Sequence, residues 1–268
     1  MRNHIKLPKS LTPRVISILV LAPIVIAAIW ILDRDGIHFA FCLLLFGALF
    51  EWAAVARIET QFARLAYALL GAGTALILPL AGLGITEMLI FYALIASTLG
   101  IFFVLFFKQL KGILANRLLI LLLGYVIGFG AALSIRSIAS SFEAILSLLL
   151  LVALTDSAAY LVGNFFGNHR IRFEVSPKKT WEGTIGGIVV GLACLALFDS
   201  MLNWLPIQSF FLWPVLIVFI IFGDLFESAM KRTANIKDSG TFLPGHGGFM
   251  DRIDSLLAVA PCTYYCLG

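Results

Sequence analysis

Apolar stretches, each close to the length of a membrane span, follow one another through most of this sequence. They cover residues 15–32, 37–56, 65–84, 88–107, 113–135, 144–163, 183–202 and 210–226. A bilayer core about 30 Å thick needs roughly 20 helical residues, at about 1.5 Å each, to cross it. A shorter apolar run at 255–268 closes the chain and is under-length for a span. The sequence therefore predicts an all-α, polytopic membrane protein with eight to nine transmembrane helices.

The composition excludes most soluble classes of protein. Hydrophobic residues make up 61% of the 268 residues and charged residues 13%, whereas soluble domains have about 45–50% and about 25%. Disordered, collagen-like, coiled-coil and disulfide-stapled secreted chains do not fit this balance. The four cysteines lie in apolar runs without a CxxC pair, which indicates buried small hydrophobic residues.

The positions of lysine and arginine predict the orientation in the membrane. When the N-terminus is placed in the cytoplasm, all but Arg34 and Arg136 of the 19 basic residues fall on the cytoplasmic side of the predicted spans. Short cytoplasmic loops of membrane proteins carry this excess of positive charge. The net charge of +4 is explained by topology, so no nucleic-acid partner is expected.

Two hydrophilic segments, at about 164–182 and 227–254, interrupt the apolar pattern on the predicted cytoplasmic side. They divide the chain into N-terminal transmembrane helices (1–143) and a second transmembrane region (144–268) that contains both segments. Gly183, Gly187 and Gly191 recur every fourth residue on the seventh predicted span. Such a stripe favours close helix packing, either within one subunit or at a dimer seam.

Acidic residues within or beside apolar spans are costly and therefore informative. Glu51 lies beside Trp52 near the cytoplasmic end of its span, where an interfacial anchor and a functional role are equally consistent with the sequence. Asp156 is followed at helical spacing by Tyr160 and Asn164, which places a polar stripe on the last turns of the sixth span. A polar seam against a neighbouring helix is the alternative interpretation of that stripe.

A second polar face begins at Asp224. Asp224, Glu227, Ser228 and Lys231 are spaced i, i+3, i+4 and i+7, so their side chains share one side of a helix. A solvated cytoplasmic extension of the eighth span is one interpretation. It fits Glu227 and Lys231 but explains poorly an aspartate at the membrane boundary.

A glycine-rich loop follows and leads into the last helix. Glycines 245, 247 and 248 allow the backbone to approach a ligand closely. Asp251 and Asp254, spaced i, i+3, open that helix at the end that favours acids. Carboxylates that bind Mg²⁺ beside lysine and arginine are typical of phosphate chemistry.

These residues carry a specific resemblance. The chain resembles the phosphatidate cytidylyltransferase (CDP-diacylglycerol synthase) family at Ser228, Lys231, Arg232, Lys237, Asp238, Gly240, Leu243, Pro244, His246, Gly247, Gly248, Asp251, Arg252 and Asp254. The earlier segment is similar to that family at Asp156, Tyr160, Gly163, Phe166, Gly167 and the run from Ser176 to Gly183. The likeness is strong over about 156–254 and topological before that.

The resemblance implies a nucleotidyltransferase of phospholipid biosynthesis that condenses CTP with phosphatidate into CDP-diacylglycerol and pyrophosphate. Residues 144–268 then form the catalytic region, with the site at the cytoplasmic face of a bacterial plasma (inner) membrane. Mg²⁺, as one ion or a metal pair, is expected on Asp224 and Asp251, with membrane lipids and a second copy of the chain as further partners. The implied catalytic residues are Asp224, Asp251, Lys231 and Asp238. The implied substrate-binding residues are Asp156, Tyr160, Ser176, Lys178, Lys179, Thr180, Ser228, Arg232, Lys237, His246, Gly247, Gly248, Arg252 and Asp254.

Two other classes remain open from the sequence. One is a different CTP-using lipid enzyme, such as a polyprenol kinase. The other is a transporter, for which charges in the middle of the spans and broken paired helices are expected. The clustering of charge at one face favours an interfacial enzyme.

Overall fold

The computed structural model describes residues 23–81, 84–171, 175–202, 211–236 and 248–267. Residues 23–31 are helical. The helices that follow are α2 (Arg34–Val55), α3 (Gln61–Ile77), the short 3₁₀ helix η1 (Leu78–Ala81), α4 (Thr86–Leu105), α5 (Phe107–Leu114), α6 (Arg117–Ile138), α7 (Phe142–Phe166), α8 (Trp181–Leu202), α9 (Trp213–Thr233) and α10 (Met250–Leu267). Within the described ranges, extended backbone pairs only at an isolated bridge between Arg170 and Thr180. The all-α prediction is confirmed.

Six helices are long and apolar enough to cross a membrane: α2, α4, α6, α7, α8 and α9. Helix α3, with 17 residues, is shorter. The polytopic prediction is thus confirmed, whereas the finer count of eight to nine spans stays a prediction. Residues 15–22 of the predicted first span at 15–32 lie outside the described residues.

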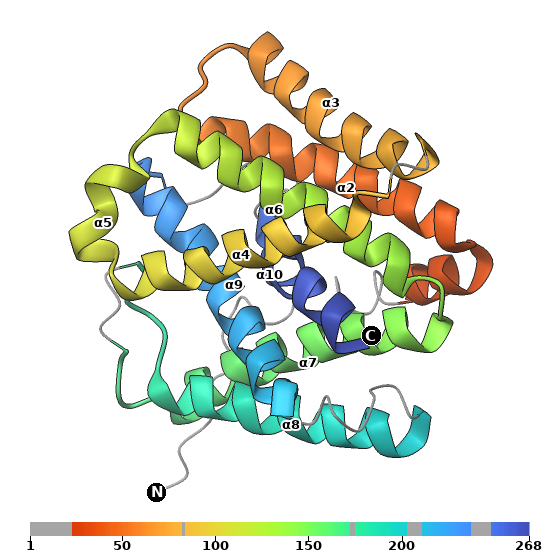
Figure 1. The fold of residues 1–268 in the computed structure, drawn as a ribbon. Coiled ribbons are helices and arrows are strands. Elements are labelled where there is room, and N and C mark those ends of the chain that lie inside the picture. The colour runs from red at the N-terminus through yellow and green to blue at the C-terminus, as the bar shows by residue number, and fades with distance from the viewer. Residues whose placement is uncertain (1–22, 82–83, 172–174, 203–210, 237–247, 268) are drawn as a thin grey trace, which may run out of the picture.

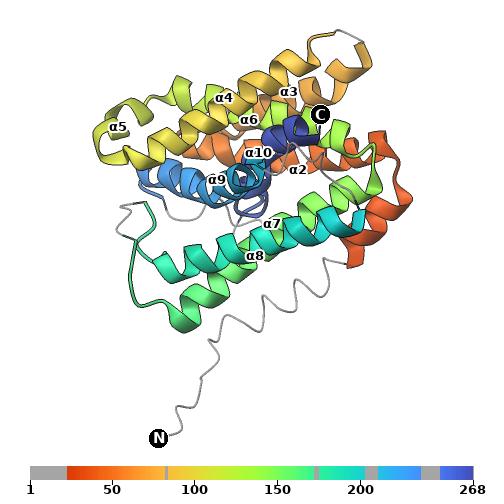
Figure 2. The same cartoon turned by 60° about the horizontal axis from the view of Figure 1, so that its bottom comes forward.

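Helices α7 and α8 run side by side along one flank of the molecule, apart from the bundle of α2, α3, α4 and α6 (Figures 1 and 2). The glycine stripe explains their close contact. A side chain at Gly183 would come within 2.6 Å of the carbonyl oxygen of Ala159, and one at Gly187 within 3.2 Å of that of Thr155. This stripe therefore packs α8 against α7 within one chain, as the first of the two interpretations predicts.

Helix α10 lies at the centre of the fold and contacts α9, α6, α4, α2 and α7 (Figure 1). It begins at Met250, ahead of the apolar run at 255–268, in agreement with the expectation that Asp251 and Asp254 open the last helix. Helix α9 continues past the apolar run, which ends at residue 226, to Thr233 and includes the helical face predicted from Asp224 to Lys231. Both helices extend through polar sequence because their polar side chains find partners on each other, as described next.

Candidate active site

Three carboxylates converge where α9 meets α10. Asp224 and Glu227 come from α9 and Asp254 from α10, and one oxygen of each lies within 4.8 Å of the others. The side chain of Glu227 is only 2% exposed, and its Oε1 atom accepts no hydrogen bond from the described residues. Desolvation and the nearby carboxylates of Asp224 and Asp156 raise the pKa of Asp254 well above its ordinary value. A buried unsatisfied oxygen among crowded acids fits a hard divalent cation, which prefers oxygen ligands.

The sequence brings these acids together through helix spacing and one glycine. Residues 224 and 227 share a face of α9, and residues 251 and 254 share a face of α10. Gly223 lets the two helices approach, since a side chain there would come within 2.8 Å of the Cα atom of Ser255. The close approach therefore occurs beside the cluster itself.

Lys231 joins α9 to the start of α10. Its Nζ atom lies 2.6 Å from Glu227 Oε2 and 2.6 Å from Asp251 Oδ1. Asp251 also accepts a hydrogen bond from the backbone of Gly248 at 2.9 Å. Glu227 and Lys231 are both buried, so the interpretation of this stretch as a solvated extension is wrong for these two residues. Glu227 was not among the predicted site residues, although its place on the polar face of α9 was visible in the sequence.

Lys179 connects the first polar segment to the acidic cluster. Its Nζ atom lies 2.7 Å from Asp224 Oδ2. The neighbouring Thr180 caps α8, because its side-chain oxygen accepts the backbone N–H of Gly183 at 3.2 Å. Arg232 donates to the carbonyl oxygen of Val175 at 3.3 Å. The two predicted motif segments therefore meet at the end of α9.

The remaining predicted residues surround this centre or lie outside the described ranges. Asp156 on α7 interacts electrostatically with Asp224 and Lys179, and Tyr160 follows one turn later. Ser176 and Ser228 are half-buried, whereas Lys178 and Arg252 are exposed. Predictions for Lys237, Asp238, His246 and Gly247 fall on residues that the structure does not describe.

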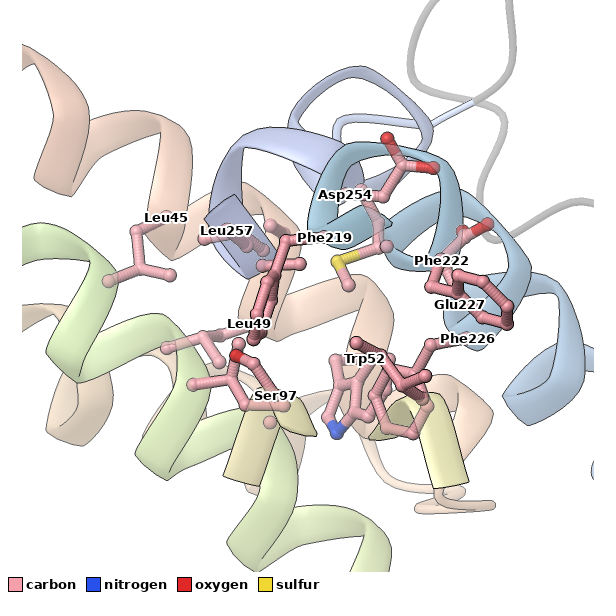
Figure 3. A pocket seen from close by; sticks show the side chains of 17 residues that line it. Leu45, Leu49, Trp52, Ser97, Phe219, Phe222, Phe226, Glu227, Asp254 and Leu257 are labelled. Atoms are coloured by element: carbon pink, nitrogen blue, oxygen red, sulfur yellow. The ribbon is translucent and has the colours of Figure 1, made fainter. Parts of the chain in front are cut away.

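A mostly apolar pocket of about 30 Å³ lies behind the carboxylates, between α2, α4, α6, α9 and α10. Figure 3 shows Glu227 and Asp254 at one end of it, with Trp52 and Ser97 on the far side. Since one water needs about 10–15 Å³ on this measure, the pocket has room for about two. A nucleotide or an acyl chain needs a site of several hundred Å³. The pocket as it stands does not hold a molecule of that size, and its apolar walls strengthen the electrostatic interactions at its mouth.

Comparison with known proteins identifies relatives along most of the chain. Residues 12–268 match the Cytidylyltransferase family. The chain is 34% identical over 265 residues to a phosphatidate cytidylyltransferase of Pseudomonas aeruginosa, which covers 94% of each chain. It is 46% identical over 116 residues to a phosphatidate cytidylyltransferase of Bacillus subtilis, a match that covers 42% of this chain and 43% of that protein. A chloroplastic phosphatidate cytidylyltransferase 4 of Arabidopsis thaliana is 45% identical over 118 residues, covering 42% of this chain and 29% of the plant protein.

Proposed function

The chain belongs to the cytidylyltransferase family, and from this membership we propose that it condenses CTP with phosphatidate to give CDP-diacylglycerol and pyrophosphate. The observation that carries the proposal is the convergence of Asp224, Glu227 and Asp254 beside Lys179 and Lys231. A reaction that joins two polyanions requires this combination, because several negative charges must be held together at one place.

In the proposed reaction, a phosphate oxygen of phosphatidate attacks the α-phosphorus of CTP. The bond from that phosphorus to the bridging oxygen breaks, and pyrophosphate leaves with the electron pair. A phosphate monoester with a second pKa near 6 is already largely dianionic at neutral pH, so no protein base is needed. His246 is accordingly proposed as a residue that fixes the glycine loop or contacts phosphate, together with Gly247 and Gly248.

Divalent-metal binding is proposed for the acidic cluster. Asp224 and Asp251 are the metal ligands expected from the family, and the geometry supports Glu227 and Asp254 as additional oxygen donors beside Asp224. Bound Mg²⁺ would neutralise phosphate charge and orient the leaving group. Asp251 is paired with Lys231, so these two residues hold one another in place beside the cluster.

Binding of the two substrates is proposed for the basic and polar residues around the acids. Lys179 reaches Asp224 and is positioned to contact the triphosphate, and Lys178 is exposed beside it. The other residues proposed to hold phosphate, nucleotide or headgroup are Asp156, Tyr160, Ser176, Thr180, Ser228, Arg232, Lys237 and Arg252. Asp238 is proposed as a catalytic residue together with Asp224, Asp251 and Lys231. The site is proposed to face the cytoplasm of a bacterial inner membrane, where CTP is available, and a second copy of the chain is proposed as a further partner.

The test is a reaction with purified protein, labelled CTP and phosphatidate in mixed micelles. The proposal requires CDP-diacylglycerol and pyrophosphate in equal amounts, dependent on Mg²⁺. Transfer of the γ-phosphate of CTP to polyprenol would instead identify a polyprenol kinase. Solute flux across proteoliposomes without either product would identify a transporter.

A further inference from the structure

Glu51, near the end of α2, contacts the start of α10, which lies almost 200 residues later in the sequence. Its carboxylate accepts one hydrogen bond from the backbone N–H of Phe249 at 3.0 Å and another from Met250 at 2.9 Å. The residue is 6% exposed. A surface anchor would keep its carboxylate in water, so the interfacial interpretation of Glu51 does not fit this structure.

The end of α2 is shaped to receive α10. Gly47 lies one turn before Glu51, and a side chain there would come within 2.7 Å of the Phe249 ring. Trp52 fixes this end of α2 to α6, because its indole N–H donates to the carbonyl oxygen of Ile120 at 2.7 Å. Glu51 therefore projects from a rigid support rather than from a mobile surface.

The contact is chemically specific. The first backbone N–H groups of a helix have no partner within the helix and carry partial positive charge, which a carboxylate satisfies. Asp251 takes the N–H of Gly248, and Glu51 takes the next two. Glu51 therefore satisfies the N–H of the residue just before α10 and that of its first residue.

The same turn of α10 carries the acids of the proposed active site. Asp251 is paired with Lys231, and Asp254 lies in the acidic cluster with Asp224 and Glu227. Any rotation or fraying of this turn would move both carboxylates. The backbone atoms that Glu51 holds immediately precede Asp251.

We infer that Glu51 is a positioning residue, which holds the start of α10 so that Asp251 and Asp254 face α9. In this role it acts through the backbone of residues 249 and 250. The inference about helix position stands on the contacts alone, whereas its consequence for metal binding rests on the proposed function.

Glu51→Ala tests this inference, with Glu59→Ala as the matched control. Glu59 is an exposed acid just beyond the same end of α2, so its loss removes an equal charge without touching α10. We expect faster hydrogen exchange at residues 249–254 in Glu51→Ala, and Mg²⁺ binding measured without substrates to weaken by about tenfold or more, as for other supports of metal ligands. Glu51→Gln, which keeps one acceptor oxygen, should lie between wild type and Glu51→Ala in both measurements, and Glu59→Ala should match wild type.

The outcomes separate the inference from the proposed function. Unchanged exchange at residues 249–254 in both Glu51 variants would overturn the positioning role, as would an equal rise in exchange over every helix. If Glu51→Ala does not fold, Glu51→Gln decides by the same two measurements. A wild-type protein that binds no Mg²⁺ and forms no CDP-diacylglycerol would refute the proposed function, while the exchange pattern would still decide the role of Glu51.

Discussion

Lys179 and Asp224 form an ion pair with 2.7 Å between Nζ and Oδ2, and this pair joins the two polar segments of the chain. Lys179 lies just before α8, and Asp224 lies within α9. The Lys179 ammonium group therefore lies beside Asp224, one of the three carboxylates that could hold a metal ion. Because both side chains are partly exposed, the pair contributes little to stability by itself. Its value lies in placing a cation where the proposed triphosphate would arrive.

The first prediction separates Lys179 from its neighbour. Lys179→Ala should raise the KM for CTP about tenfold, since a charge-assisted contact to phosphate is worth roughly 1.5 kcal/mol at the lower end of its range. Lys178→Ala should have a smaller effect, because Lys178 is exposed and it is Lys179 that pairs with Asp224. Steady-state kinetics with varied CTP provides the measurement. Full activity in the double variant would remove both lysines from the site.

A second prediction concerns stability. Lys231→Met leaves Glu227 and Asp251 without their shared cation, and breaking a buried ion pair costs about 3–5 kcal/mol. The variant should therefore unfold at a clearly lower temperature in detergent. Lys231→Met combined with Glu227→Gln should recover part of the loss, because the buried carboxylate is removed as well. An unchanged unfolding midpoint for the single variant would show that Lys231 serves only the reaction.

Much of the helical fold is predictable from apolar periodicity, because each membrane helix must satisfy its own backbone. Apolar periodicity does not reach the end of α9 or the start of α10, which the spacing of polar residues indicates instead. Both helices run through polar sequence, where Lys231 bridges Glu227 and Asp251 across the two helices. Hydropathy alone measures transfer to lipid, and it does not register polar groups that are satisfied by another helix.

The site residues also differ in how far they can be predicted: those that share one helix are visible in the sequence, whereas those that meet only through packing of distant helices are not. Spacing along one helix placed Asp224 and Lys231 on a common face, and the structure brings them to one end of α9. The contribution of Glu51 depends on how α2 packs against α10, a contact between residues that lie 198 and 199 positions apart. A single sequence contains no spacing that reports such a contact.

The third prediction tests the orientation in the membrane. Accessible tags at residues 170 and 240 should both report the cytoplasm, while a tag near residue 204 should report the outer side, as the distribution of basic residues requires. Selective labelling from either side of the membrane provides the measurement. Labelling of position 240 only from outside would contradict the orientation, and with it the use of cytoplasmic CTP.

The last prediction tests the carboxylates. Asp224→Asn and Asp251→Asn should each abolish turnover while the protein still inserts and purifies normally, because loss of a metal ligand costs on the order of 10³-fold in rate. The double variant should be barely worse than either single one, since residues that act as a unit are not additive.

Titration of Mg²⁺ without substrates then distinguishes the two aspartates of α10. Asp254 lies within the cluster of Asp224 and Glu227, whereas Asp251 is held by Lys231 and by the backbone of Gly248. Asp254→Asn should weaken Mg²⁺ binding as strongly as Asp224→Asn does. If Asp251→Asn weakens it equally, all of these carboxylates share the metal. If Asp251→Asn leaves Mg²⁺ binding intact and still abolishes turnover, Asp251 acts in the reaction through Lys231, and the metal belongs to the other three acids. Modest, additive losses that follow protein yield would refute a metal role for every one of them.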